Sequence, residues 1–498
     1  MSVHSTYAQD ALFKASDIDI PYTKYTLDNG LTLLVHEDHK APIVAVNIWY
    51  HVGAKNEKEG KTGFAHLFEH LMFNGSENYD HDYFQVMDRI GATDLNGTTN
   101  SDRTNYFQNV PLSGLDQVLF LESDRMGHLL GAIDQEVLDE QRGVVQNEKR
   151  EGENKPYGRQ NGLMTEAMYP KGHPYSWTVI GSMEDLNAAS LDDVHAWFKQ
   201  YYGPNNAVIC LAGDISPEEA LEKVNLYFGD IPPGPSLARH DVNIPNKESN
   251  SRQSYEDQVA ESRITIRWHS PKAGTKDEAL LELASMVLSD GKNSRLYKDL
   301  VYDKQWVSSI YSYQWSREIA GSFVIDANIK PDHSVEEVEA RIHELLETYM
   351  KEGPSKEEIA MAKASYFSGM LKGLERIGGF GGKSDILCRY ETFMGNADHY
   401  KTSLKYIEEA TAEEILDAMQ RYLTKGHHTL ICTPFENRVA NEKGVDRSSL
   451  PELGEPADPK FPANESFTLD NGMKVQLIKR KDVPTVNMSM IIDAGTVS

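Results

Sequence analysis

The pattern of apolar and polar residues along the chain predicts strands mixed with amphipathic helices. Residues 25–36 read as a strand, an Asp-Asn-Gly turn and a second strand, which is typical of a β-hairpin. Short apolar runs predict further strands, and apolar residues at helical spacing predict long helices. We expect buried strands at 43–53, 207–215 and 263–268, and helices at 278–291 and 335–353.

The chain length predicts more than one domain. A single core rarely grows beyond about 250–300 residues, and this chain has 498. A stretch rich in Pro, Ser, Asn and Gly at 231–253 reads as a linker, with strands and helices on both sides. We therefore expect an α+β fold with these parts: an N-terminal extension (1–20), a first domain (21–232), a linker (233–254), a second, similar domain (255–455) and the start of a further unit (456–498).

An internal repeat links the two ends of the chain. FTLDNGMKVQLI (467–478) matches YTLDNGLTLLVH (25–36), and the match continues without a gap to the paired residues Pro42 and Pro484, Val44 and Val486, and Gly53 and Gly495. A unit of about 440 residues therefore begins again near residue 462. We expect a complete first half followed by the clipped start of a second half, whose counterpart of His66 would lie beyond residue 498.

Charge and cysteine content exclude several classes of protein. The net charge of −26 argues against a nucleic-acid binder and leaves room for a peptide or cationic partner. The three cysteines are far apart, which predicts free buried thiols rather than disulfides. No apolar run is long enough to span a membrane, and no export signal is visible. We expect a periplasmic location if a signal was removed, and a cytoplasmic one otherwise.

The segment TGFAHLFEHLMF (62–73) carries the strongest chemical signal. On a helix, His66 and His70 share one face with Glu69 beside them, and the remaining residues from Phe64 to Phe73 are apolar. A helix that is apolar all round is buried, and buried polar groups need partners. One zinc ion bound by both imidazoles answers that need, and Glu69 can act as general base on the activated water.

A third ligand is expected on the segment QEVLDEQRGVVQNEKRE (135–151). A helical wheel puts Glu148 and Gln141 at the centre of its apolar face. An acid in the middle of a buried stripe needs a cation, either a metal or a buried Arg or Lys. We predict that Glu148 is the third zinc ligand, with an ion pair as the alternative.

This arrangement resembles the pitrilysin/insulinase family of zinc metallopeptidases, the inverzincins, whose motif is His-x-x-Glu-His. The segments 96–111, 173–186, 201–215 and 377–387 also resemble family features, so the resemblance covers nearly the whole chain. It implies a metalloendopeptidase (a hydrolase) in which two halves of two α+β domains each form a clamshell around a peptide chamber. The second domain would carry no metal. The partners implied are a peptide substrate and the second half of the same chain, with a homodimer as a further possibility.

The resemblance also assigns roles to other residues. Asn96 and Gly97, on an expected edge strand at 96–110, would bind substrate. Members of the family often have a second Glu where this chain has Gln141, which would instead hydrogen-bond a metal ligand. An Arg and a Tyr from the second half usually help to bind substrate, so this chain alone is expected to bind zinc yet cleave poorly.

Other functional interpretations have weaker support in the sequence. GGFGGKS (378–384) lacks the glycine that a nucleotide-binding P-loop requires, since that position is Ile377, and we interpret it as a substrate-contact loop or a plain loop. No GxSxG motif is present, and no cysteine has a histidine nearby that would activate it. The alternative to an enzyme is a non-catalytic peptide-binding or structural subunit of the same fold.

Overall fold

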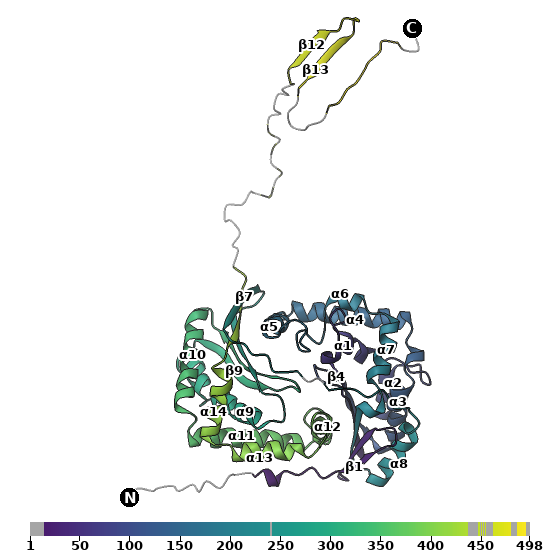
Figure 1. The fold of residues 1–498 in the computed structure, drawn as a ribbon, viewed down its shortest axis with the longest axis vertical. Helices are drawn as coiled ribbons and strands as arrows, with labels where there is room; N and C mark the ends of the chain where they lie inside the picture. The colour runs from purple at the N-terminus through teal and green to yellow at the C-terminus, as the bar shows by residue number, and fades with distance from the viewer. Residues whose placement is uncertain are drawn as a thin grey trace. The chain divides into compact units, whose positions relative to one another are not determined.

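The computed structural model describes residues 14–239, 242–436, 462–479 and 486–494, together with residues 447, 448, 450, 452 and 454. The chain forms two compact units, Met1–Glu436 and Asn437–Ser498. Residues 1–13 of the expected N-terminal extension lie outside the described residues, as do residues 240 and 241 of the expected linker. The first unit contains two sheets flanked by helices (Figure 1), so the predicted α+β class is confirmed.

The first sheet has six strands in the order β1-β2-β6-β3-β5-β4. The pair β2 and β6 is parallel and its other neighbours are antiparallel. The last strand in this order, β4, is an edge strand. The bounds are β1 Thr23–Thr26, β2 Thr32–Glu37, β3 Ile43–Tyr50, β4 Thr93–Thr99, β5 Thr104–Pro111 and β6 Ala207–Gly213.

The second sheet repeats this topology without a counterpart of β1. Its order is β7-β11-β8-β10-β9, and β7 and β11 are the parallel pair. Position by position, β7, β11, β8, β10 and β9 correspond to β2, β6, β3, β5 and β4. The bounds are β7 Ser251–Asp257, β8 Ser262–Ser270, β9 Val307–Trp315, β10 Gly321–Ile329 and β11 His427–Pro434. The two sheets are therefore similar, as the sequence predicts.

Both faces of the first sheet pack against helices. On the first sheet, alternate residues such as Leu33 and Val35 join a core with α1, α3, α7 and α8, while Leu34 and Ala45 face the opposite core. The helices of this half are α1 Phe64–Leu71, α2 Tyr83–Ile90, α3 Leu115–Gly127, α4 Gln135–Asn154, α5 Gln160–Met168, α6 Met183–Asn187, α7 Leu191–Tyr201 and α8 Pro217–Phe228. Period-two alternation along the strands thus divides one sheet between two cores.

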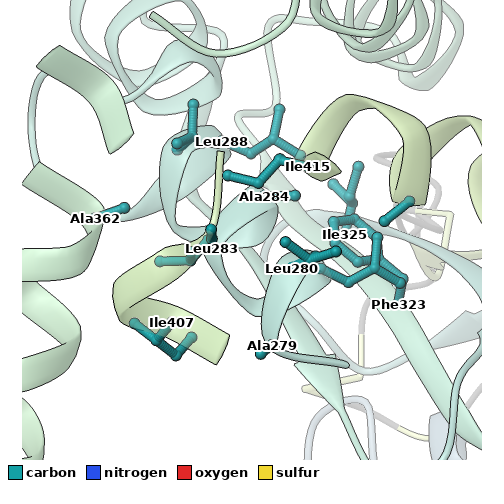
Figure 2. Close-up of a cluster of buried hydrophobic side chains, with 14 of the residues drawn as sticks. Ala279, Leu280, Leu283, Ala284, Leu288, Phe323, Ile325, Ala362, Ile407 and Ile415 are labelled. Carbon is teal, nitrogen blue, oxygen red and sulfur yellow. The ribbon is translucent and has the colours of Figure 1, made fainter. Parts of the chain in front are cut away.

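The helices that follow the linker pack mainly on the second sheet. In Figure 1, α10, α11, α13 and α14 gather on one side of that sheet. Figure 2 shows the core beneath them, where Leu280, Leu283 and Leu288 of α9 meet Phe323 and Ile325 of β10. The bounds are α9 Lys276–Ser289, α10 Val335–Glu352, α11 Lys356–Leu374, α12 Lys383–Met394, α13 His399–Glu409 and α14 Ala412–Leu423.

Each half of this unit also contributes one helix to the other half. Helix α12 packs on β3 and β6 of the first sheet, and α5 packs on β11 of the second. Leu387 and Cys388 of α12 are fully buried in the same core as Leu34, and Met164 of α5 is buried with Leu430 of β11. Burying a large apolar side chain stabilises the fold by roughly 1.5–3 kcal/mol, so this exchange holds the two halves together.

The second unit contains the repeated hairpin. Strands β12 Asn464–Thr468 and β13 Lys474–Ile478 are antiparallel, and Thr468 faces Lys474 as Thr26 faces Thr32 in β1 and β2. The two hairpins therefore share their register as well as their sequence. The further repeat positions Pro484 and Gly495 lie outside the described residues.

Most local predictions are confirmed, and one is wrong. The strands expected near 43, 207 and 263 and both long helices are present. The single strand expected at 96–110 is instead two strands, β4 and β5, which reverse direction at Asn100–Arg103. Asn100 accepts hydrogen bonds from the backbone of Asp102 and Arg103, which fixes that turn. The three cysteines are free and buried, as predicted. Within the described residues, no helix is long and apolar enough to cross a bilayer.

Candidate metal centre

Contacts at its N-terminus fix the position of helix α1 within the core. It begins after Gly63, whose φ of +83° and close approach to the carbonyl oxygen of Ile180 leave no room for a side chain. The carboxylate of Glu57 accepts hydrogen bonds from the backbone N–H groups of Gly63 (3.1 Å) and Ala65 (2.8 Å). An acid at a helix N-terminus satisfies N–H groups that have no partner within the helix. Burial raises the pKa of Glu57, although these bonds from the backbone pull it down. The orientation of α1 is therefore fixed from its first turn.

Two histidines and a glutamate meet on this helix and its neighbour α4. The rings of His66 and His70, one helical turn apart, have centroids 4.8 Å from each other. Oε2 of Glu148 lies 3.7 Å from Nε2 of His66 and 3.5 Å from Nε2 of His70. One ligand atom from each of the three residues lies within 4.8 Å of the others. The structure thus brings together all three residues that the sequence singles out as ligands.

The donor set fits a zinc ion. In a tetrahedral site with bonds of about 2.0–2.1 Å, ligand atoms are separated by roughly 3.3 Å, close to the spacing of Glu148 from each imidazole. Burial, with His70 nearby, lowers the pKa of His66 to about 4, and burial lowers the pKa of His70 despite Glu148 and Gln141 beside it. Both rings are therefore neutral at pH 7, which is the form that binds metal.

The surroundings of Glu148 differ from those expected. The sequence places this residue in the middle of a buried apolar stripe, but its side chain is 52% exposed and neighbouring Val144 is 42% exposed. Only Leu138 and Val145 of α4 are buried. The stripe borders open clefts rather than a core, since Gln141 and Glu148 both line such clefts. The residue is placed as predicted, but the argument from burial is wrong.

Glu69 is the buried member of the group. It is 7% exposed, and its Oε2 accepts a hydrogen bond of 2.6 Å from the hydroxyl of Thr99, at the end of β4. Burial raises the pKa of Glu69 to about 7, although Thr99 and the charge of Arg103 pull it down. A carboxyl group with a pKa near neutrality can both accept and return a proton at physiological pH.

A cleft of about 610 Å³ opens beside these residues. It is lined by Glu69 and His70 together with Asn96, Gly97 and Gln141. Gln141 lies beside His70 and raises the pKa of that imidazole, and a Cβ at Gly97 would lie 2.5 Å from the ring of Phe73. The three residues for which only the family resemblance suggested roles therefore lie around the same cleft as the histidine and the buried acid.

Glu57, Thr99 and Arg103 are parts of this site that the sequence did not single out. Their contacts join the loop before α1, the edge strand β4 and the turn after it to the metal helix. Glu57 lies six residues before Gly63, too far along the chain for the capping patterns of neighbouring residues to indicate it. No local signal connects Thr99 with Glu69, because only the packing of β4 on α1 brings them together.

Two family models match the chain. Residues 32–176 match the model described as insulinase (peptidase family M16), and residues 188–366 match the model described as the peptidase M16 inactive domain. The first match contains all of His66, Glu69, His70 and Glu148.

Individual proteins show the same relationship. The chain is 28% identical to the zinc protease PqqE of Helicobacter pylori over 358 residues, covering 70% of this chain and 79% of that protein. A solved protease from Helicobacter pylori superposes with a TM-score of 0.77 at 24% identity, covering 83% of this chain and 99% of the other. The periplasmic protease PqqL from Escherichia coli gives a TM-score of 0.69 at 17% identity, covering 94% of this chain but 56% of the other.

Proposed function

We propose that this chain, which belongs to the insulinase family of peptidases (family M16), is a zinc-dependent endopeptidase that hydrolyses peptides or unfolded segments. The observation that carries the proposal is the convergence of His66, His70 and Glu148 beside the buried carboxyl group of Glu69. The name of the relative in Helicobacter pylori, zinc protease PqqE, supports the same activity. The family model for the second segment is described as inactive, which is consistent with the absence of histidine from α9, the helix that follows β8 as α1 follows β3.

His66, His70 and Glu148 would hold one zinc ion per chain. A bound zinc ion supplies Lewis acidity, which lowers the pKa of a water molecule to about 7 and polarises a carbonyl group. The two imidazoles contribute neutral nitrogen donors, and Glu148 contributes the single negative charge of the ligand set. Gln141, which lies beside His70, would help to orient that ring by accepting a hydrogen bond from it.

Glu69 would move the proton. Its carboxylate accepts a proton from the attacking water and returns it to the departing amine, which requires a pKa near the working pH. The hydroxyl of Thr99 holds Oε2 of Glu69 in a fixed position and leaves Oε1 to exchange the proton. Burial of the acid excludes bulk water, so that the proton passes between the reacting groups.

The substrate would lie along β4. This strand is at the edge of the first sheet, so its outer backbone groups can pair with an extended peptide. Asn96 lines the cleft beside Glu69 and offers a side-chain amide, and Gly97, whose missing side chain makes room for the ring of Phe73, lines the same cleft. Both residues are proposed to bind substrate on these grounds.

A second half is proposed to complete the enzyme. The shared register of β1–β2 and β12–β13 supports a further unit of the same fold within one chain, and the coverage of the larger PqqL protease is consistent with it. A second copy of the chain is the other arrangement to test. The PqqL relative is described as periplasmic, which makes the periplasm the first compartment to examine for this protein.

The test is a substrate comparison on the full-length natural protein. We expect the zinc-loaded protein to cleave short unstructured peptides, to leave a folded protein intact, and to lose activity when a chelator is added. Equal cleavage of the folded protein would contradict the substrate class. Binding of peptides without cleavage of any of them would instead favour the non-catalytic peptide-binding subunit.

A further inference from the structure

A second cavity begins next to the catalytic base. It has a volume of about 360 Å³ and is lined by Thr99, the residue that hydrogen-bonds Glu69. Its walls come from both halves of the first unit, because residues of the β4–β5 turn, the end of β9 and helix α12 all contribute. The residues that matter here are Trp49, Arg103, Arg317 and Arg389.

Within the part of the chain that the structure describes, the three arginines of this cavity have no ion-pair partner. Arg103 donates to the backbone oxygen of Thr98 at 2.8 Å, and Arg317 donates to the hydroxyl of Tyr169. Arg389 is exposed on α12. Among the described residues, none of these guanidinium groups has a carboxylate oxygen within 4 Å. Other acids, such as Asp385, act on Arg103 and Arg389 only from farther away.

The carboxylates of the same cavity already have partners. Asp102 accepts hydrogen bonds from the hydroxyl of Tyr175 and the backbone N–H of Glu318. Glu318 bonds His51 at 2.7 Å and pairs with Lys55. Asp385 accepts from the backbone N–H of Gly381 at 2.9 Å. The acids are therefore satisfied and the arginines are not, in a chain whose net charge is −26.

Buried donors in the cavity wall also lack acceptors. Arg103 is 8% exposed and its guanidinium lies 4.9 Å from the ring of Trp49, which is 3% exposed. Nε of Arg103, Nε of Arg317 and the indole N–H of Trp49 are buried with no hydrogen-bond partner among the described residues. A buried donor that is left unsatisfied destabilises the folded protein, and a ligand with oxygen acceptors would remove that cost.

We propose that this cavity binds a carboxylate group of the peptide substrate, with Arg389 as its accessible cationic contact. The proposal rests on the proposed peptidase function, since it names a preferred feature of the substrate. A carboxylate offers up to four acceptor sites and is the anion that peptides carry, either on an acidic side chain or at the C-terminus. The shared residue Thr99 places the bound carboxylate close to the bond that is cleaved.

At long range, the overall negative charge of the protein disfavours the binding of acidic peptides. A net charge of −26 repels acidic peptides before they arrive, an effect that salt screens beyond about 8 Å at physiological ionic strength. The preference for a carboxylate is therefore local, and we expect it to be clearest at moderate salt.

The test is a binding measurement on the full-length Glu69→Gln protein loaded with zinc, using fluorescence anisotropy of labelled peptides. Four versions of one short unstructured peptide are compared. They carry either Glu or Gln at an internal position and either a free or an amidated C-terminus. We expect at least one carboxylate to tighten binding about tenfold, as one charge-assisted hydrogen bond would, and the version that does so identifies its source.

Substitution then locates the site. Arg389→Gln should abolish the gain from the carboxylate, whereas Lys292→Gln, an equal change of charge at an exposed position outside the cavity, should keep it. Equal binding of all four peptides to the Glu69→Gln protein would overturn the proposal. So would an Arg389→Gln protein that weakens all four peptides to the same extent, or a Lys292→Gln protein that loses the gain.

The experiments distinguish failure of the carboxylate site from failure of the proposed peptidase function. If wild-type protein cleaves the neutral peptide but shows no carboxylate preference, only the carboxylate site is wrong. If no peptide is cleaved while the preference is present, the peptidase is wrong and a carboxylate-selective peptide-binding site stands.

Discussion

The hydroxyl of Thr99 donates a hydrogen bond of 2.6 Å to Oε2 of Glu69. Thr99 belongs to the edge strand β4 and Glu69 to helix α1, so this bond joins the proposed substrate strand to the proposed catalytic base. The bond fixes the position of one oxygen atom of the buried carboxylate.

Loss of this bond should slow catalysis without removing metal. Thr99→Val keeps the shape of the side chain and removes the donor, and a hydrogen bond to a charged group contributes about 1.5–3 kcal/mol. We expect kcat to fall about tenfold or more, with KM and zinc content nearly unchanged, and Thr99→Ser to restore the rate. The check is steady-state kinetics beside metal analysis. An unchanged kcat in Thr99→Val would remove this residue from the mechanism.

Glu69→Gln should separate metal binding from turnover. The amide keeps the size of the side chain but cannot accept a proton, and general acid–base catalysis contributes about 10²–10⁴-fold to rate. We expect zinc content to stay near one per chain and peptide hydrolysis to fall by at least about 10²-fold. Metal analysis and a peptide assay on the same preparation measure both. Retained activity would assign the base to another group.

Substitution of a proposed ligand should lower the zinc content of the protein, whereas substitution of a surface histidine should not. His70→Ala removes one of three protein donors, so we expect zinc content to fall from about one per chain to near zero, and Glu148→Gln to lower zinc affinity. His39→Ala, at an exposed position paired with Asp214, is the matched control and should keep its zinc. The check is metal analysis after dialysis. Full zinc content in His70→Ala would contradict the proposed site.

Glu318 should make stability depend on pH in acid. Burial raises its pKa, but the hydrogen bond from His51 and the charge of Lys55 more than offset this and lower it to about 2. Because the folded pKa lies below the ordinary value of 4.5, the stabilisation is complete above about pH 4.5 and is lost as the pH falls toward 2. The full effect is about 3 kcal/mol.

The measurement is denaturation of the metal-free protein. Without metal, loss of zinc in acid cannot contribute to the change in stability. We expect Glu318→Gln to be less stable than wild type at pH 6, with the difference shrinking as the pH approaches 2. A difference that stays constant between pH 3 and 6 would show that the ion pair does not set the acid sensitivity.

The sequence was informative where function depends on local spacing. His66, Glu69 and His70 lie within five consecutive residues, so helical geometry alone predicts that they share a surface. The repeated TLDNG turn likewise predicts both hairpins, because a turn is determined by its own residues. These features needed no knowledge of the tertiary fold.

The remaining features depend on contacts between distant segments. Helical spacing assigns Glu148 to an apolar face, whereas its position beside the histidines depends on how α4 crosses α1. Arg389 meets Arg103 at one cavity only because α12 packs on the first sheet. Periodicity within a segment reports which face is apolar but not which element will cover it. The prediction of Glu148 therefore rested on an assumed burial that the structure does not show, and the meeting of the arginines was not predicted.

The most direct test of the account is a zinc titration of peptide hydrolysis by the full-length natural protein after its metal has been removed. If His66, His70 and Glu148 form one catalytic zinc site, the initial rate should be near zero without metal, rise in proportion to added zinc and level off at about one equivalent per chain. A rate that is independent of added zinc, or no hydrolysis of a broad set of unstructured peptides at full zinc occupancy, would contradict it.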